Sequence, residues 1–386
     1  YVPACAVIVR KKLEKSEEIP ALFLEGKLPE DKHKIIPLKL AISSLKEREG
    51  KLYLNFIGSR SFLDEEKIEI VRKKSHYYNS FYQGATIVPQ PCWFVDIVDE
   101  RVPLVKTSER AKIRGKVKYE IGSLPIEREF LYYVLTSAEV LPFCHLEPNI
   151  AVLPIIPHRD KYFLMKRKTA IDSGKIHLAK WLEKVEEIWE KVRGEKAKKM
   201  SIYDRIDYQR LLTNQNPNAK YIVVYLTSAT HLASCVINNE YWKKKSLLKK
   251  PVIIESTLYR FFTNSEDEAY YLTAILNSSV LDELIKPMQA KGFTGAERHI
   301  HKKPLEFPIS RFNEDDEIHI QLSELGKKAT EKAYKILPKI LKKKEYDEKL
   351  KKRGTLVPTE VANLRTAIRE ELREELEEID CRITFI

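Results

Sequence analysis

Residues 291–303 contain the densest group of side chains that could bind an anionic ligand. Six of these thirteen residues are Lys, Arg or His. Gly292 and Gly295 allow the backbone to turn tightly and to approach a ligand closely. Positive charge on a loop with two glycines suits a clamp on a polyanion such as DNA, and the alternative is an ordinary solvated loop. The candidate contact residues of this loop are Arg298, His299, Lys302 and Lys303.

Further candidate phosphate contacts lie at two other places in the sequence. Arg205, Arg210 and Lys220 flank a polar turn at residues 214–218, ahead of an apolar run that is typical of a buried strand. Between residues 110 and 118, five Lys and Arg residues alternate with other residue types. On a β-strand this alternation places all five charges on one face, which is either a phosphate-facing strip or a solvated surface. The candidate contacts in this strip are Arg114 and Lys116.

The sequence contains no good catalytic or metal-binding arrangement. His299 and His301 are the only close histidine pair, and a metal site needs a third and fourth ligand. No G-x-G-x-x-G or Walker loop is present to hold a nucleotide. Asp64, Glu65 and Lys67 have the spacing of a nuclease acid–acid–lysine string, but such strings are common in a chain that is 32% charged. We therefore expect no catalytic residue, metal ion or cofactor in this chain.

Composition indicates the class of partner. The formal net charge is +12 and the pI is about 9.1, which points to an acidic partner such as nucleic acid. The five cysteines are far apart and form no C-x-x-C pair, so we expect a reducing, cytoplasmic environment without disulfides. No apolar run approaches the roughly 20 residues that span a bilayer, so we expect no membrane partner. High Lys and Glu with few Met and Gly gives the composition a thermophile-like character.

Both helices and strands must position these side chains, so we predict an α+β fold. It consists of a strand-rich region with amphipathic helices and a helical C-terminal tail. Alternating or short apolar runs predict strands at residues 1–9, 51–58, 150–156, 221–226, 252–254 and 259–262. Apolar residues at helical spacing predict helices at residues 126–137, 175–193, 201–212, 267–285, 316–344 and 360–379.

Residues 77–98 are rich in aromatic side chains. Aromatic rings near a basic face can stack on nucleobases. We expect Trp93 and Phe94, however, to fill the core, and we expect the same of Trp181 and Trp189 on the helix at 175–193.

We divide the chain into four parts. We place a strand of a further domain at residues 1–10, a strand-rich subdomain at 11–120, a recognition domain at 121–312 and a helical region at 313–386. Tyr1 is not preceded by a turn or a Met and lies in mid-strand. We therefore expect the sequence to be a piece of a longer chain.

Several stretches occur together in one order along the sequence. They are residues 81–89, 93–95, 126–132, 140–143, 179–182, 188–189, 221–225, 292–303, 305–309 and 377–380. Together these stretches resemble the C-terminal, target-recognition half of adenine-specific DNA methyltransferases of restriction–modification systems. The resemblance covers most of residues 75–386. Each motif alone has low specificity, and the resemblance depends on the order and spacing of the motifs along the chain.

The resemblance implies a division of labour between this chain and an absent catalytic domain. The catalytic half of this family carries a glycine-rich S-adenosylmethionine loop and an Asn-Pro-Pro-aromatic motif, and neither is present here. The run Asn216-Pro217-Asn218 lacks the second proline and the aromatic residue. The resemblance thus implies that this chain holds double-stranded DNA while the catalytic domain flips and methylates an adenine. Where relatives tend to have Arg this chain has Gln90, so we expect no phosphate contact there.

Two other functions remain open from the sequence. The chain could act as a nuclease through Asp64, Glu65 and Lys67, either alone or fused to the methyltransferase. It could instead be a protein-interaction scaffold that docks a partner on the amphipathic helix at residues 360–379.

Overall fold

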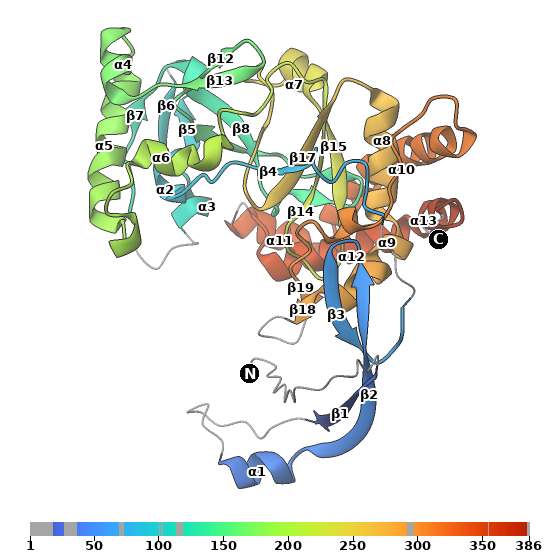
Figure 1. Ribbon diagram of the computed structural model, residues 1–386. Helices are drawn as coiled ribbons and strands as arrows, with labels where there is room; N and C mark the ends of the chain where they lie inside the picture. Colours follow the sequence, from blue (N-terminus) through green and yellow to red (C-terminus); the bar gives the residue numbers. More distant parts are fainter. Residues whose placement is uncertain are drawn as a thin grey trace.

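The structure is a computed structural model that describes residues 18–26, 37–68, 73–99, 101, 103–112, 119–291, 297–353 and 355–383. It confirms a mixed α+β fold. Two sheets form the centre of the body, helices of the C-terminal region lie to one side, and an arm extends away from the body (Figure 1). The strand predicted at residues 1–9 lies outside the described part of the chain.

A six-stranded sheet forms one half of the body. All neighbouring strands are antiparallel except β16 and β8, which are parallel. The boundary predicted between residues 120 and 121 falls inside this sheet, because it takes strands from both sides of that point. In spatial order the strands are β16 (Ile253–Ile254), β8 (Leu131–Leu135), β11 (Asn149–Val152), β5 (Phe94–Asp99), β6 (Leu104–Thr107) and β7 (Leu124–Pro125).

The prediction of a helix at residues 126–137 is wrong. Arg128–Phe130 forms a single 3-10 turn, and the chain then continues as β8. All five residues of β8 are buried, and aromatic and β-branched residues predominate in its sequence, Leu-Tyr-Tyr-Val-Leu. Such residues fit a pleated surface well, and a fully buried strand shows an apolar run that periodicity alone does not separate from a helix.

A four-stranded antiparallel sheet forms the other half of the body. The strand predicted at 221–226 is confirmed as β14, the second strand of this sheet. Tyr225 and Tyr259 face each other across β14 and β17 with ring centroids 5.2 Å apart. The short strand β4 forms one edge of the sheet. In spatial order the strands are β15 (Ser234–Asn238), β14 (Tyr221–Leu226), β17 (Leu258–Thr263) and β4 (Tyr82–Gln83).

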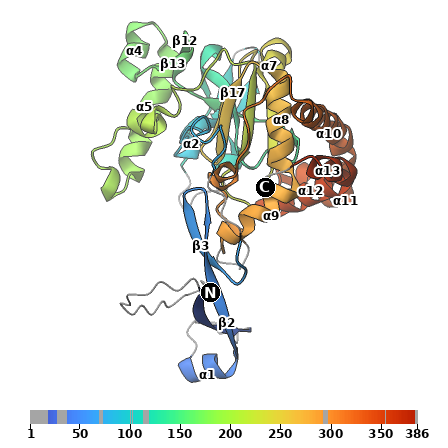
Figure 2. The same cartoon turned by 45° about the vertical axis from the view of Figure 1, so that its right-hand side comes forward.

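Helices cover one face of the four-stranded sheet. Helix α8 packs on β14 and β15, α9 continues from the end of α8, and α10 to α13 gather on the far side of α8 (Figure 2). Ser265 caps α8 and Asp316 caps α10 through their side-chain oxygens. These helices are α8 (Glu266–Asn277), α9 (Ser279–Ile285), α10 (Glu317–Leu341), α11 (Lys344–Arg353), α12 (Pro358–Glu371) and α13 (Arg373–Asp380).

Two of the long helices expected from the sequence are each broken once. The helix predicted at 267–285 is interrupted at Ser278, whose hydroxyl accepts a hydrogen bond from Leu281 N and so starts α9. The helix predicted at 360–379 is interrupted at Leu372, between α12 and α13. Its apolar stripe is buried within the chain and is therefore not a docking surface. The stripe consists of Val361, Leu364, Ile368, Leu372, Leu376 and Ile379.

The tryptophans expected in the core are buried there. Trp181 donates a hydrogen bond from Nε1 to the carbonyl of Cys92, and Trp189 donates one to the carbonyl of Met200. Both lie on α5 (Ile176–Val192), which confirms the helix predicted at 175–193. Trp93 and Phe94 are also buried. None of these rings is available to stack on a ligand.

The helix predicted at residues 201–212 is shorter than expected. Ser201 caps it in a reciprocal capping box with Asp204, but α6 (Ile202–Ile206) ends after five residues. The carboxylate of Asp207 then accepts hydrogen bonds from Leu212 N and Thr213 N, which folds the chain into a compact turn instead of further helix.

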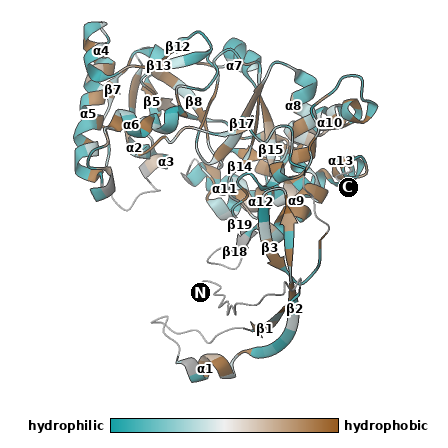
Figure 3. Ribbon diagram, viewed as in Figure 1, coloured by the Kyte–Doolittle hydropathy of each residue, from teal (hydrophilic) through white to brown (hydrophobic). Residues whose placement is uncertain are grey.

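The remaining short elements surround the two sheets, and hydrophobic residues concentrate on the sheet strands (Figure 3). Among the described residues, no helix is both long and apolar enough to cross a membrane. The short elements are α2 (Gln90–Trp93), α3 (Glu109–Lys112), α4 (Arg167–Asp172), α7 (Asn239–Lys245), β9 (Val140–Leu141), β10 (Cys144–His145), β12 (Ile155–His158), β13 (Lys161–Leu164), β18 (Ala290–Lys291) and β19 (Glu297–Arg298).

The arm is a three-stranded antiparallel sheet with one short helix at its far end (Figure 1). Its strands are β1 (Glu18–Glu25), β2 (Lys46–Ile57) and β3 (Arg60–Asp64), and its helix is α1 (Leu38–Ser43). The turn between β2 and β3 lies against the body. The arm therefore connects to the candidate site through Gly58, Ser59 and Arg60.

Gly326 provides a test of the packing between α8 and α10. A Cβ at this position would lie 2.3 Å from the carbonyl oxygen of Tyr270 in α8, so the two helices would have to separate. We expect Gly326→Ala to lower the free energy of unfolding by about 1–3 kcal/mol, measured by urea denaturation. Gly194→Ala is the matched control, because a Cβ there meets nothing within 4 Å. Equal stability of the two variants would contradict this close packing.

Candidate nucleic-acid interface

The carboxylate of Glu306 is the centre of the candidate site. Its side chain is 1% exposed and lies in the 3-10 turn Lys303–Glu306. It accepts hydrogen bonds from Ser59 N at 3.0 Å and from Arg60 Nε at 3.0 Å, and it pairs with Lys74 Nζ at 3.6 Å. This one carboxylate therefore joins the arm, the segment before β4 and the loop after β19.

Gly58 allows this close contact. The residue has φ +57°, in the left-handed region, and a Cβ there would lie 2.3 Å from Glu306 Oε2. Glycine is therefore needed at this turn both for its backbone conformation and for the space that the carboxylate occupies. The turn brings Ser59 and Arg60 onto the carboxylate.

Cations outnumber carboxylates around Glu306. Lys302 and Lys303 lie in the same group as Arg60 and Lys74, close enough that the charge of Lys74 acts on Lys302 and that of Arg60 on Lys303. We call this group the Glu306 cluster; it consists of Glu306, Arg60, Lys74, Lys302, Lys303, His299 and His301. Arg60 and Lys74 pair with Glu306, whereas Lys302 and Lys303 lie beside them on backbone carbonyls. The cluster therefore has a positive charge that its own residues do not neutralise.

Burial, with a contribution from neighbouring cations, lowers the pKa values of three groups in the cluster. Burial lowers the pKa of Lys303 to about 8, and the charge of Arg60 acts in the same direction. Burial also lowers the pKa of Lys302, with Lys74 adding to the effect and Glu306 opposing it. The pKa of His301 is lowered by burial and by its charged neighbours, Lys303 among them. A nearby anion would favour the charged forms of these groups.

Backbone carbonyls hold the two lysines in place. Lys302 Nζ donates to the carbonyl of Tyr78 at 2.7 Å and lies 4.9 Å from the centre of the Tyr78 ring. Lys303 Nζ donates to the carbonyl of His299. Lys74 Nζ also lies over the Tyr78 ring, at 4.1 Å. The ammonium groups are therefore positioned before any ligand arrives.

The two histidines adopt unusual backbone conformations at the surface. His299 has φ +65° and His301 φ +45°, and their rings stack in parallel with centroids 5.8 Å apart. His301 N donates to the carbonyl of Thr227 at 2.9 Å, which ties the loop to the end of β14. Positive φ at non-glycine residues costs about 1–3 kcal/mol each and is concentrated at functional sites.

The structure brings together only part of the predicted contact set. His299, Lys302 and Lys303 lie in the Glu306 cluster. Lys220 precedes β14, at the end opposite to Thr227, and six residues of strand span about 20 Å. Arg205 lies on α6, and Arg210 lies in the turn after it with φ +58°. The predicted contacts therefore occupy at least two separate places.

Several of the predicted contacts lie wholly or partly outside the described residues. The backbone of Arg298 belongs to β19, but nothing is described of its side chain. The predicted basic strand at 110–118 is wrong where it is described, because Arg110 and Lys112 belong to the short helix α3. Outside the described residues lie Gly292, Gly295, Arg114 and Lys116.

Sequence reasoning missed Arg60, Lys74 and Glu306 as site residues. Arg60 and Glu306 are 246 residues apart, and no local pattern connects them. One signal was present: Glu306 interrupts the apolar run 305–309, and a carboxylate at a position that packing buries needs a cationic partner. The identity of that partner followed only from the fold.

The nuclease-like string does not form a metal site. Glu65 pairs with Arg48 at 2.8 Å on the arm, and this hydrogen bond lowers the pKa of Glu65. Asp64 accepts a hydrogen bond from Glu66 N. Across the described ranges, no three His, Cys, Asp or Glu side chains are placed so that they could hold a metal ion.

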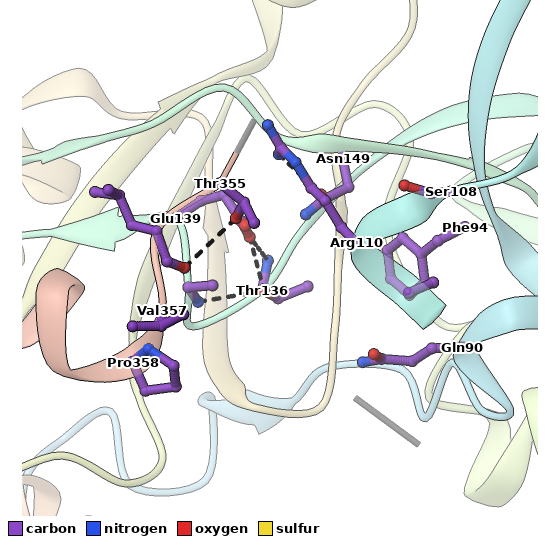
Figure 4. A pocket seen from close by; sticks show the side chains of 13 residues that line it. Gln90, Phe94, Ser108, Arg110, Thr136, Glu139, Asn149, Thr355, Val357 and Pro358 are labelled. Atoms are coloured by element: carbon purple, nitrogen blue, oxygen red, sulfur yellow. Dashed lines mark hydrogen bonds between the residues drawn. The ribbon is translucent and has the colours of Figure 1, made fainter. Parts of the chain in front are cut away.

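A pocket of about 370 Å³ lies between β5, α3 and the start of α12 (Figure 4). Its buried carboxylate, Glu139, accepts hydrogen bonds from Thr136 N and Thr136 Oγ1. The described lining residues include Gln90, Phe94 and Asn149.

Comparisons with known proteins find similarity among solved structures only. No family model matches the chain, and no curated protein matches it. Among solved structures, the chain is similar to the Type IIL restriction-modification enzyme MmeI in complex with DNA. The TM-score is 0.46 at 9% sequence identity, over 88% of this chain and 36% of that enzyme. This chain thus spans little more than a third of the enzyme's length, and a similarity this low establishes neither fold nor function.

The Glu306 carboxylate is tested by Glu306→Gln, which keeps the shape of the side chain and removes its charge. Arg60 and Lys74 are about one-third exposed and keep access to water, so we expect a loss of about 1–3 kcal/mol in the free energy of unfolding. Urea denaturation measures the loss. Glu324→Gln on the exposed face of α10 is the control and should change stability by less than about 0.5 kcal/mol. Equal effects of the two variants would show that the carboxylate does not hold the cluster together.

Proposed function

We propose that this chain is the double-stranded DNA recognition module of an adenine-specific DNA methyltransferase of a restriction–modification system. The observation that carries the proposal is the Glu306 cluster, in which Arg60 and Lys74 pair with one buried carboxylate and Lys302 and Lys303 lie beside them. Their charge is only partly compensated, and burial makes each uncompensated cation costly. Binding of phosphates would remove that cost.

The arrangement favours an extended polyanion over a small anion. The cluster draws on three segments that are distant in the sequence, and aromatic side chains lie beside it at Tyr78 and Tyr82. The whole chain carries a net charge of +12, which attracts a polyanion at long range. Phosphate contacts of this kind would fix the position of a duplex, while base edges would be read by other side chains.

The assignment to a methyltransferase is supported by the sequence motifs described above. In this proposal the catalytic domain belongs to the parent chain, binds S-adenosylmethionine and transfers the methyl group. The present chain supplies the DNA contacts and is expected to be inactive alone. The parent protein would act in the cytoplasm, where its DNA substrate lies.

Salt dependence of DNA binding tests the proposal. We expect the chain to bind a fluorescent duplex with an affinity that falls as the salt concentration rises. The slope of log K against log salt concentration should be about −0.9 for each phosphate that the protein neutralises. Lys302→Gln should weaken binding and make this slope shallower by about 1. Fluorescence anisotropy at salt concentrations from about 50 to 300 mM measures both the affinity and its slope against salt.

The matched control for this experiment is Lys335→Gln. Lys335 is exposed on α10, a helix that contributes no residue to the cluster, and its substitution should leave affinity and slope unchanged. Binding of duplex DNA that does not respond to salt, or an equal effect of both substitutions, would overturn the proposal.

Lys303 provides a test through pH. Its pKa in the free protein is about 8, and a nearby phosphate would raise it towards its ordinary value of 10.5. Between these two values the complex binds more protons than the free protein, so we expect affinity to fall as pH rises from about 8 to 10. Calorimetry in buffers of different ionisation enthalpy should show proton uptake on binding. Lys303→Arg should reduce the uptake, because arginine stays charged; uptake that is unchanged in this variant would place its source elsewhere.

A further inference from the structure

Tyr82 is an exposed aromatic side chain on a rigid support beside the Glu306 cluster. It is 56% exposed, whereas most large aromatic side chains of the described core are buried. Its strand β4 is fixed at the sheet edge by pairing with β17, by the hydrogen bond from Gly84 N to Leu258 O, and by the side chain of Gln83, which donates to Ser256 O. A ring held in this way loses little conformational entropy when a ligand stacks on it.

The residue opposite Tyr82 in the sheet is a buried arginine that forms no ion pair with any described carboxylate. Arg260 is 3% exposed, and its Nε has no hydrogen-bond partner. Its guanidinium donates to the carbonyl of Leu211 at 3.4 Å and lies 4.8 Å from the centre of the Phe262 ring. A buried and incompletely satisfied guanidinium is costly, and a nearby electron-rich group would lower that cost.

Cationic groups therefore lie on two sides of Tyr82. Arg260 lies opposite it in the sheet, and Lys302 Nζ lies 6.0 Å from its ring centre. Lys302 also belongs to the Glu306 cluster, so the aromatic surface and the phosphate-binding surface are continuous. Nucleic acid combines the two matching chemistries, since it presents a π-face on each base and a negative charge on each phosphate.

The accessible face of Tyr82 restricts which part of a nucleic acid it could contact. In a paired duplex, the faces of the bases are covered by their neighbours, and only base edges are exposed in the grooves. Stacking on a tyrosine ring therefore requires a base that has left the stack. We propose that Tyr82, with Arg260 and Lys302 beside it, forms a stacking site for one unstacked nucleobase of the bound DNA. This inference rests on the proposed function and adds a ligand to the same surface.

Three DNA molecules of equal length test the site with the full chain. They are a fully paired duplex, the same duplex with a one-nucleotide bulge, and the same bulge with an abasic nucleotide. The abasic bulge keeps the charge and flexibility and removes the base alone. We expect the base-containing bulge to bind about 5- to 100-fold more tightly than the abasic bulge, the range that stacking on one aromatic side chain gives. Fluorescence anisotropy measures the three affinities.

Variants of Tyr82 separate stacking from other effects. Tyr82→Ala should abolish the difference between the two bulges and leave binding of the paired duplex nearly unchanged, while Tyr82→Phe should retain the difference. Tyr241→Ala, at a 58% exposed tyrosine on α7, is the control and should behave like the unmodified chain. Because both tyrosines are exposed, neither substitution is expected to unfold the protein, and urea denaturation verifies this.

The outcomes distinguish this inference from the proposed function. Equal affinity of the unmodified chain for the two bulges, together with salt-dependent binding of the duplex, would overturn the stacking site and leave the DNA module intact. A difference between the bulges that persists in Tyr82→Ala would also overturn the stacking site. Absence of binding to all three molecules would overturn the proposed function itself.

Discussion

The site depends on one buried carboxylate that serves several cations. Glu306 is nearly inaccessible to water, and without Arg60 and Lys74 its charge would be unacceptably costly to bury. The same contact fixes the turn between β2 and β3 on the body, so the arm, the segment before β4 and the loop after β19 are positioned together. The requirement for glycine at position 58 follows from this contact.

The carboxylate stabilises the cluster but does not neutralise it. Lys302 and Lys303 are positioned by backbone carbonyls, which hold an ammonium group without removing its charge. Burial lowers the pKa values of both lysines, and the neighbouring cations Lys74 and Arg60 add to the effect. Stability and binding are therefore opposed in this region: the residual positive charge that costs folding free energy is the charge that a polyanion would use.

The sequence predicted the fold where the signal was local and failed where it depended on distant residues. The buried strand β14 and the amphipathic helices α5 and α10 follow from periodicity and capping. The strand β8 was mistaken for a helix because burial on both faces removes the alternation that identifies a strand. Within the site, Lys302 and Lys303 were accessible to sequence reasoning as part of a dense basic run. Arg60 and Lys74 were not, because only the fold brings them to Glu306.

The most direct test of the central claim is lysine-modification footprinting of the full chain with and without duplex DNA, quantified by mass spectrometry. The account predicts that DNA protects Lys74, Lys302 and Lys303 from acylation and leaves Lys335 on α10 equally reactive in both samples. Under conditions where the duplex is bound, unchanged reactivity of Lys74, Lys302 and Lys303 would show that DNA does not occupy the Glu306 cluster and would contradict the account.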